Sequence, residues 1–178
     1  MDSLPKKEAK LKAARYCAYQ ERTQQQVREK LQTLLFDEDL IEEIIAELIT
    51  ENFISEERFA KSFTSGKFRL KKWGRNKILM HLRQKGLTDY CIREGMKEID
   101  EGDYREQIRN LIQAKFESLK IEDTFQKKDR VSKYLISRGY EPDLVWKYLV
   151  VGVEPAFGLH EQTRSGSGCD IMSVSNRA

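Results

Sequence analysis

The chain is poor in the residues that build enzyme sites and covalent frameworks. Its 178 residues include only three Cys, an odd number at widely spaced positions, so neither a disulfide framework nor a cysteine metal knuckle is expected. The two His residues have no acidic or thiol partner at the spacing of metal ligands. The sequence also has no glycine-rich phosphate loop, no H-E-x-x-H and no G-x-S-x-G. We therefore expect no enzyme activity, no cofactor and no bound metal.

Long apolar runs are absent as well. No stretch approaches the roughly 20 apolar residues that a membrane span needs, and the N-terminal segment MDSLPKKEAKLK lacks the apolar core of a signal peptide. We expect a cytoplasmic protein without membrane contact. Proline is scarce, with three residues, and none falls inside a strong helical pattern. The remaining composition, 39% hydrophobic and 34% charged, is typical of a small helical protein.

What the chain does contain is an internal repeat of helical character. Three segments align without a gap: Val27-x3-Leu31-x3-Leu35-Phe36, Ile78-x3-Leu82-x3-Gly86-Leu87 and Val131-x3-Leu135-x3-Gly139-Tyr140. The second copy begins 51 residues after the first, and the third 53 residues after the second, which is the length of a three-helix unit. After each copy, apolar residues recur at the spacing of a helix stripe.

The repeat predicts an all-α fold, an elongated array of three tandem three-helix repeats that curves to the right or to the left. We expect the repeats at residues 7–54, 55–102 and 103–151. Each unit has too little apolar surface to bury alone, so neighbouring units are expected to stack.

Capping and turn residues place the helices. Thr23 opens a capping-box pattern, and Ser55 is positioned to cap the helix that begins the second repeat. Gly86 and Gly139 hold equivalent positions, where a left-handed residue closes a helix. Leu35 holds that position in the first repeat, so we expect its turn to close differently.

The first helix of each repeat is expected to bury one apolar stripe. In the second repeat, Phe59, Phe63 and Leu70 fall within about 40° of one another on a helix, and Gly66 lies on the same side, where it would permit close approach of another helix. The corresponding residues are Leu11, Ala14, Cys17 and Ala18 in the first repeat, and Ile108, Leu111, Ile112, Phe116 and Leu119 in the third.

Residues 152–178 differ in kind from the repeats. They contain glycine and serine breaks and show no helical or strand periodicity. We interpret them as a disordered tail or as sequence that is not native to the fold, and keep a docked functional tail as the alternative.

Charge is strongly segregated along the chain. Residues 37–57 carry nine acidic side chains and no Lys or Arg, whereas residues 58–88 carry ten basic side chains and no Asp or Glu, although the net charge is only +3. A basic run of this length is unusual for a merely soluble surface and indicates a binding face. The alternative is a solvated face that its acidic neighbour partly neutralises. The candidate residues for binding a partner or DNA are Arg58, Lys61, Lys67, Phe68, Arg69, Lys71, Lys72, Arg75, Lys77, Arg83 and Lys85.

Phe68 is a candidate because it lies about 180° from the stripe of Phe59 and Phe63, among basic side chains. Two interpretations are open. Phe68 packs against the adjacent repeat, or it is an exposed contact for a partner protein or a base.

Segments of the middle repeat resemble a known family. Asn52-Phe-Ile-Ser-Glu-Glu-Arg-Phe-Ala60, followed by Gly74-Arg-Asn-Lys-Ile78 and Leu82-Arg-Gln-Lys-Gly-Leu87, is similar to the pattern G-Y-(L/I)-(D/N)-D-x-x-F-A, then G-x-x-x-I-x-x-x-L-x-x-K-G-(I/L), of the RecX regulatory proteins. The resemblance covers residues 9–150. The chain departs from the pattern at Asn52-Phe53, where the family often has Gly-Tyr, but Asn also tolerates a left-handed turn.

This resemblance implies a function without chemistry. RecX proteins are three tandem three-helix repeats that bind the RecA recombinase on its filament on single-stranded DNA and modulate it, usually by inhibition. The expected partners are therefore the RecA filament and single-stranded DNA, which is contacted directly or through the filament. The expected processes are recombination, DNA repair and the SOS response. We expect the protein to be a monomer. The basic middle repeat would face DNA or an acidic wall of the filament, and the acidic third helix a basic recombinase surface. The rival hypothesis is an autonomous helical DNA-binding module without recombinase specificity, which explains the basic run but not the acidic one.

Overall fold

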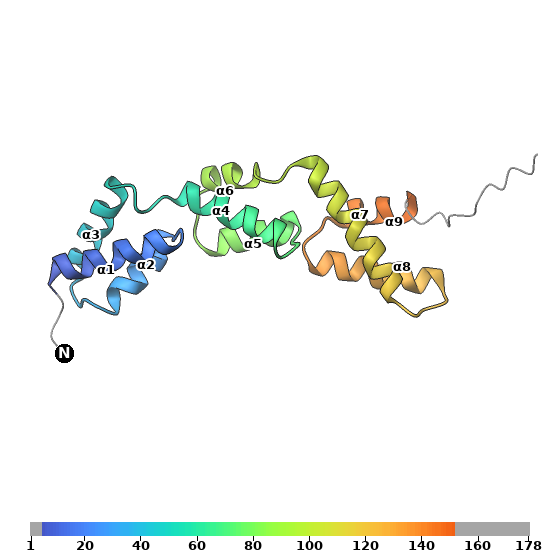
Figure 1. Cartoon of the computed structure of the whole chain (residues 1–178), viewed down its shortest axis with the longest axis horizontal. Coiled ribbons are helices and arrows are strands. Elements are labelled where there is room, and N and C mark those ends of the chain that lie inside the picture. The colour runs from blue at the N-terminus through green and yellow to red at the C-terminus, as the bar shows by residue number, and fades with distance from the viewer. Residues whose placement is uncertain (1–4, 152–178) are drawn as a thin grey trace, which may run out of the picture.

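A computed structural model describes residues 5–151, which form nine α-helices in an elongated, gently arched array (Figure 1). The helices are α1 (Lys6–Tyr19), α2 (Gln24–Gln32), α3 (Glu38–Thr50), α4 (Glu56–Arg69), α5 (Arg75–Gln84), α6 (Asp89–Met96), α7 (Glu101–Ser118), α8 (Thr124–Ser137) and α9 (Pro142–Val151). We call α1–α3 repeat 1, α4–α6 repeat 2 and α7–α9 repeat 3. The all-α array of three-helix units is thus confirmed. Predictions about residues 152–178 lie outside the described residues.

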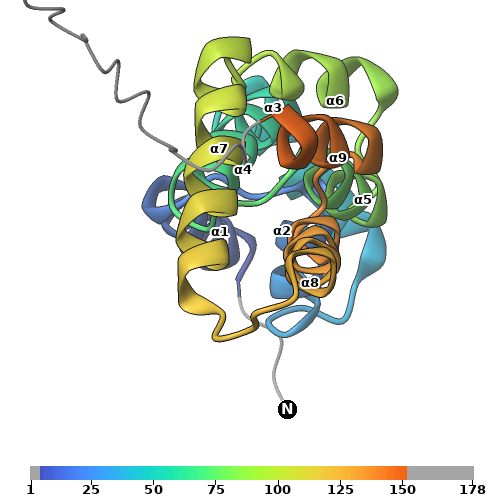
Figure 2. The same cartoon turned by 90° about the vertical axis from the view of Figure 1, so that its right-hand side faces the viewer.

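The helices of each repeat occupy regular places along the arch. In Figure 1, α2, α5 and α8 lie toward the lower, concave edge, and α3 and α6 toward the upper edge. The end-on view agrees, with α2 and α8 below α3 and α6 (Figure 2). Across the part of the chain that the structure covers, no helix combines the length and the apolar character needed to cross a membrane.

The predicted caps and turns are confirmed. Thr23 forms a full capping box, and the Ser55 hydroxyl accepts a hydrogen bond from a backbone N–H in the first turn of α4. Gly86 and Gly139 have φ angles of 75° and 92°, the left-handed conformation that glycine adopts without strain. In repeat 1 the turn closes without a left-handed residue, and the Leu35 N–H donates to the carbonyl one turn earlier, 2.9 Å away.

The buried apolar residues form two separate cores. Repeat 1 has its own core, in which Val27, Leu31 and Ile44 are fully buried. Repeats 2 and 3 share the other, which includes Ile78 and Ile108. The expectation that each repeat stacks on the next is therefore correct for repeats 2 and 3 and wrong for repeats 1 and 2, because repeat 1 buries its apolar residues among its own three helices.

Backbone hydrogen bonds join repeats 2 and 3. The Gly74 N–H donates to the Arg138 carbonyl over 2.8 Å, and the Asn76 N–H donates to the Gly139 carbonyl over 3.0 Å. The approach is so close that a Cβ on Gly139 would lie 2.4 Å from the backbone nitrogen of Lys77. Glycine at this point is therefore a requirement of the joint.

Tyr104 on α7 reinforces the same joint from inside the core. Its ring packs against the rings of Phe68 and Tyr140, with centroids 5.9 and 5.3 Å away. Its hydroxyl accepts from the Arg75 N–H and donates to Glu141, at 3.1 and 2.6 Å. Burial, and then the hydrogen bond to Glu141, raises the pKa of Tyr104, so the hydroxyl stays protonated and keeps donating.

Polar contacts of Arg58 join repeats 1 and 2. This first-turn residue of α4 places Nε 2.9 Å from a carboxylate oxygen of Glu21, in the loop between α1 and α2. Its two Nη atoms donate to the side chain and the carbonyl of Asn52, at 2.5 and 2.8 Å. Asn52 has a φ of 62°, a left-handed conformation that Asn tolerates. This joint is held by one side chain and a turn.

Parts of the predicted stripes are wrong. In α1 the residues that turn inward are Ala9, Ala13 and Cys17, whereas Leu11 is 51% exposed. Ala18, also predicted to be buried, is exposed. Small residues therefore let α1 lie close to α2 and α3.

The stripe on α4 also ends earlier than predicted. Phe59 is buried, but Leu70 is 81% exposed, because nothing in the described residues packs over this end of the α4 face, which lines an open groove. A Cβ on Gly66 would meet no atom within 4 Å, so this glycine does not mediate a close approach. The glycine that does is Gly95 on α6, whose Cβ would lie 2.8 Å from that of Ala60.

Candidate functional site on the middle repeat

Few of the basic candidates have an acidic partner. Arg58 pairs with Glu21, Lys61 with Glu57 and Arg75 with Glu101. The other seven make no ion pair within residues 5–151: Lys67, Arg69, Lys71, Lys72, Lys77, Arg83 and Lys85. Only one basic residue of the run, Lys61, therefore pairs with the acidic run that precedes it.

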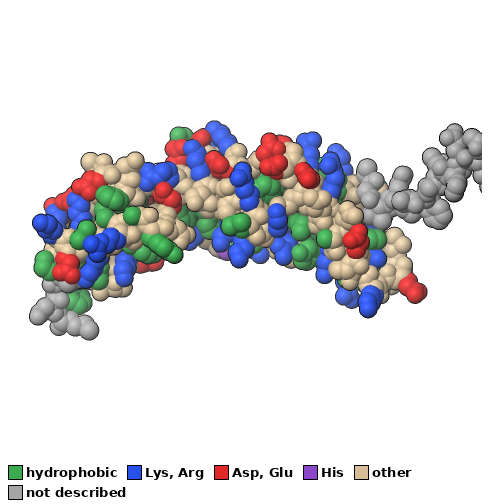
Figure 3. Space-filling model, viewed as in Figure 1, with side chains coloured by type: hydrophobic (Ala, Val, Ile, Leu, Met, Phe, Trp, Pro, Cys, Tyr) green, Lys and Arg blue, Asp and Glu red, His purple; other side chains and the backbone are tan. Residues whose placement is uncertain are grey.

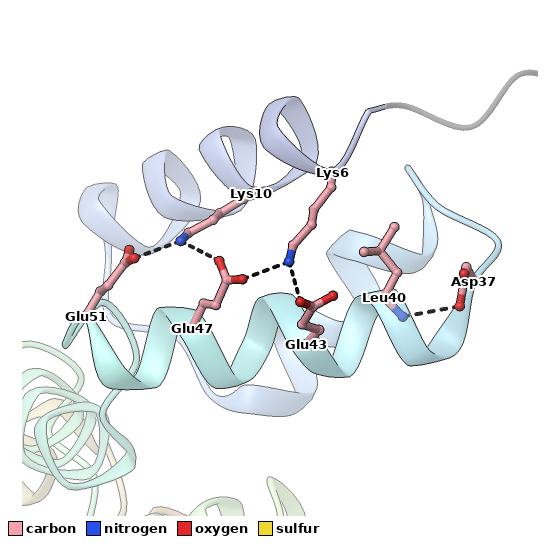
Figure 4. Close-up of polar contacts among 7 residues, drawn as sticks. All are labelled: Lys6, Lys10, Asp37, Leu40, Glu43, Glu47 and Glu51. Atoms are coloured by element: carbon pink, nitrogen blue, oxygen red, sulfur yellow. Dashed lines mark hydrogen bonds and ion pairs between the residues drawn. The ribbon is translucent and has the colours of Figure 1, made fainter.

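Instead, four carboxylates of the acidic run form ion pairs within repeat 1, three of them with Lys6 and Lys10 (Figure 4). From α1, Lys6 reaches Glu43 and Glu47 at 2.6 and 2.8 Å. Lys10 reaches Glu47 and Glu51 at 2.5 and 2.7 Å. Hydrogen bonds from Lys10 and then Lys6 lower the pKa of Glu47 to about 2. Glu43 and Glu47 on α3 and Glu51 at its C-terminal end therefore hold α1 in place.

Two further acidic side chains of the run act inside repeat 1. Nε and Nη2 of Arg28 donate to the two carboxylate oxygens of Glu42, at 2.7 and 2.9 Å. Asp37 caps α3 by accepting from the Leu40 N–H over 3.2 Å. The seven unpaired cations of repeat 2 therefore keep their charge, because the carboxylates of the preceding run that form ion pairs do so mainly within repeat 1. In the middle of the molecule, Figure 3 shows Lys and Arg beside hydrophobic side chains along the lower edge, and a mixture of acidic and basic side chains along the upper edge.

Three of the unpaired lysines lie over aromatic rings. The Lys67 ammonium is 5.1 Å from the centre of the Phe63 ring and 5.0 Å from that of Trp73. Lys77 lies 4.9 Å from Trp73, and Lys85 lies 6.0 Å from Phe63. A cation over a ring face is attracted by the ring quadrupole, which orders these side chains without neutralising them. We call this set the cation–aromatic strip: Phe59, Phe63, Lys67, Trp73, Lys77, His81 and Lys85.

His81 belongs to the strip through its ring. It stacks on Trp73 with centroids 4.8 Å apart. Burial lowers the pKa of His81, and the charges of Lys77, Lys67 and Lys85 lower it further. The imidazole is therefore neutral at pH 7 and leaves the positive charge to the lysines.

Two grooves flank α4. The first, of about 330 Å³, lies between repeats 1 and 2; we call it the junction groove, and it is lined by Gln20, Glu21, Arg22, Gln26, Phe59, Ser62, Phe63, Gly66, Lys67, Leu70, Lys71 and Lys85. The second, of about 400 Å³, lies between α4 and α7 and is lined by Phe68, Arg69, Lys72, Asp103, Glu106, Gln107, Asn110 and Leu111. The candidate residues on α4 and just after it thus divide between two faces.

Phe68 is a correction among the candidates. Its side chain is only 3% exposed and packs on Tyr104 of repeat 3. The interpretation that Phe68 packs against the adjacent repeat is the one that the structure supports, and this ring is not an exposed contact. Although Phe68 lies opposite the stripe of Phe59 and Phe63, that second face of α4 is covered by α7.

Sequence reasoning missed three residues of this surface. The sequence does not mark Trp73 or Arg22 as part of this surface, and the predicted stripe places Leu70 in the core, although Arg22 and Leu70 line the junction groove. A signal existed at Leu70, because Lys67 lies three residues before it on the same helix face and two lysines follow it directly. Nothing in the sequence indicates that the loop carrying Arg22 lies beside α4.

Comparison with known proteins gives one family match for each repeat. The family model for the first three-helix domain of RecX matches residues 9–48. The models for the second and third three-helix domains of RecX match residues 55–96 and 103–149.

Curated relatives carry the same name. The regulatory protein RecX of Clostridium botulinum (strain Eklund 17B / Type B) is 35% identical over 126 residues, which cover 70% of this chain and 58% of the relative. That of Clostridioides difficile (strain 630) is 28% identical over 141 residues, covering 79% and 66%. The chain thus spans less than two thirds of the length of these relatives. The crystal structure of RecX from Lactobacillus salivarius has the same fold, with a TM-score of 0.74 at 22% identity over 83% of this chain and 95% of that one.

Proposed function

Because this chain belongs to the RecX family of regulatory proteins, we propose that it regulates the RecA recombinase, as an inhibitor that binds the RecA filament on single-stranded DNA. The observation that carries the proposal is the set of seven basic side chains on repeat 2 that have no acidic partner among the described residues. Unpaired cations gathered in the middle of an elongated molecule attract a polyanion or an acidic protein surface.

Binding alone is sufficient for this function. The elongated, arched shape of the three repeats suits a partner that is itself extended, such as a filament (Figure 1). When it occupies the filament groove it obstructs entry of a second DNA strand, and when it occupies the growing end it obstructs addition of subunits. Neither route requires a reaction on the protein, so the basic side chains need only hold it in place.

The first test compares two targets at the same salt concentration. We expect the full chain to bind a preformed RecA filament at least about tenfold more tightly than bare single-stranded DNA, a difference of about 1.4 kcal/mol. A titration to a one-to-one ratio with RecA should lower its ATPase activity. Equal affinity for both targets, with unchanged ATPase activity, would support the autonomous DNA-binding module instead.

The second test removes the charge of the strip. The triple variant Lys67→Gln, Lys77→Gln, Lys85→Gln should weaken binding, because these ammonium groups have no other ionic partner in the part of the chain described. If they contact phosphates of a single strand, the salt slope should fall by about 0.7 for each lost contact, or about 2 in all. If they contact carboxylates of the recombinase, affinity should fall for the filament and hardly change for bare DNA.

The matched control removes the same charge elsewhere. Lys7, Lys30 and Lys120 are exposed and lie outside repeat 2, so their replacement by Gln should leave binding close to that of the native chain. Equal behaviour of the two triple variants would contradict a role for the basic face.

A further inference from the structure

One face of α4 borders a hollow that no side chain of the described residues fills. Phe63, Gly66, Lys67 and Leu70 follow one another at helical spacing along this face, and all line the junction groove. Leu70 is 81% exposed at one end. In the middle, a Cβ on Gly66 would find open space for 4 Å, so the hollow reaches the helix backbone. The floor of the groove is therefore apolar and unoccupied.

The opposite wall comes from repeat 1 and is polar. Gln20, Arg22 and Gln26 present amide and guanidinium groups, which supply both hydrogen-bond donors and acceptors. Glu21, the one carboxylate of the lining, is already paired with Arg58. Four cations face this single carboxylate, none with an ion pair within residues 5–151: Arg22, Lys67, Lys71 and Lys85. The groove thus carries a net positive charge, and a ligand that binds there needs negatively charged groups to pair with these cations.

The apolar floor distinguishes between two kinds of anionic ligand. A nucleic-acid base binds by stacking on a free aromatic face. Here Lys67 and Lys85 cover the faces of Phe63 and Phe59, and Phe59 is only 5% exposed. The exposed apolar contact is the aliphatic Leu70, which offers no ring face for a base to stack on. An aliphatic anchor, carboxylates and backbone groups that both donate and accept hydrogen bonds are the features of an acidic peptide.

We propose that the junction groove binds an acidic peptide segment of a partner protein, with a large aliphatic side chain seated beside Gly66 and Leu70 and with carboxylates on Lys67, Lys71 and Lys85. The inference goes beyond the proposed function, because it concerns a peptide site and needs no recombinase. It also assigns different roles to the basic residues on the two sides of α4. The cations on the groove side of α4 take protein carboxylates, and Arg69 and Lys72, on the other groove, are not required.

The test uses synthetic peptides and the full chain. The probe is a fluorescein-labelled peptide with a central Leu flanked by Glu and Asp, and its binding is followed by fluorescence anisotropy. Two matched probes replace the Leu by Ser, or the acids by Gln and Asn. We expect the acidic Leu peptide to bind most tightly and each matched probe to bind at least about tenfold more weakly.

Substitutions on the protein locate the site. Gly66→Leu fills the hollow while it favours the helix, and Leu70→Gln removes the exposed apolar contact; both spare the core, because neither position is buried. Each should weaken binding of the acidic peptide at least about tenfold, as should the double variant Lys67→Gln, Lys85→Gln. The controls are Met80→Gln, which removes another exposed apolar side chain, and Arg69→Gln with Lys72→Gln, which removes two charges on the other groove. Circular dichroism establishes that each variant is folded.

Three outcomes would overturn the proposal. The first is that the native chain does not bind the acidic peptide. The second is that the folded Gly66→Leu and Leu70→Gln variants bind the peptide as tightly as the native chain does. The third is that these two variants lose binding to oligothymidylate, which would make the groove a nucleic-acid site. The RecA ATPase titration on the same variants is read separately. Peptide binding without any effect on RecA would refute the proposed function and leave the groove assignment standing.

Discussion

Glycines of this chain differ in whether the fold tolerates a side chain at their position. At the joint of repeats 2 and 3, Gly139 combines a left-handed backbone with contact to the backbone of α5, so two separate requirements exclude any side chain. Gly66, in the interior of α4, has ordinary helical geometry and open space around it. The two glycines are therefore opposite cases, one needed for folding and one that leaves a surface hollow.

Gly139→Ala should destabilise the shared core of repeats 2 and 3 by more than about 2 kcal/mol, because it adds backbone strain to a steric overlap. Gly66→Ala should be neutral or stabilise the protein by up to about 1 kcal/mol, because Ala favours a helix over Gly. Denaturation by guanidinium chloride measures both. Similar midpoints for the two variants would show that the close approach at Gly139 relaxes without cost.

At the scale of elements, ion pairs connect α1 to α3 across the surface of repeat 1. Lys6 and Lys10 share Glu47 between them, which makes this carboxylate the centre of a chain of four pairs (Figure 4). Since Glu47 ionises with a pKa of about 2 instead of its ordinary 4.5, its pairing with Lys6 and Lys10 stabilises the folded state from pH 4.5 up to the alkaline pH at which the lysines lose their protons. That contribution is lost as the pH falls from 4.5 toward 2, where the folded carboxylate takes up its proton.

Glu47→Gln should therefore lower the stability of repeat 1 at neutral pH and flatten its decline between pH 4.5 and pH 2. Thermal unfolding at a series of pH values checks this. Glu122→Gln, which removes an exposed carboxylate outside repeat 1, should leave both the stability and the pH profile of repeat 1 unchanged. If Glu47→Gln gives the same profile as the native chain, the ion pairs do not stabilise the contact of α1 with α3.

The two cores predict that repeats respond separately to damage. Leu31→Ala should destabilise repeat 1 by about 2–5 kcal/mol and raise amide hydrogen exchange in α1–α3 alone. Ile108→Ala, at an equally buried position of the shared core, should raise exchange in both repeat 2 and repeat 3. Hydrogen exchange followed by mass spectrometry distinguishes the two patterns. Exchange that spreads through all three repeats in both variants would mean that the chain unfolds as one unit.

At the scale of the whole molecule, the sequence predicts the array well and its joints poorly. The helix stripes and the caps at Thr23 and Ser55 are local patterns, so they predict the helices and the three units correctly. Whether a unit shares its core depends on contacts between residues far apart in the chain, which periodicity does not encode. Phe68 illustrates this for the candidate surface. Its place on a basic helix face is readable from the sequence, but the α7 side chains that cover it are not.

The separate core of repeat 1 also affects cooperativity. A chain with two cores joined by one arginine and a turn has two thermodynamic units, so one melting temperature does not describe it, and a free energy of unfolding belongs to each core. Substitutions in different cores should therefore act additively, while those in repeats 2 and 3 couple. A weakened repeat 1 cannot be rescued by a stronger repeat 2, and repeat 1 is free to accumulate replacements independently of the other two.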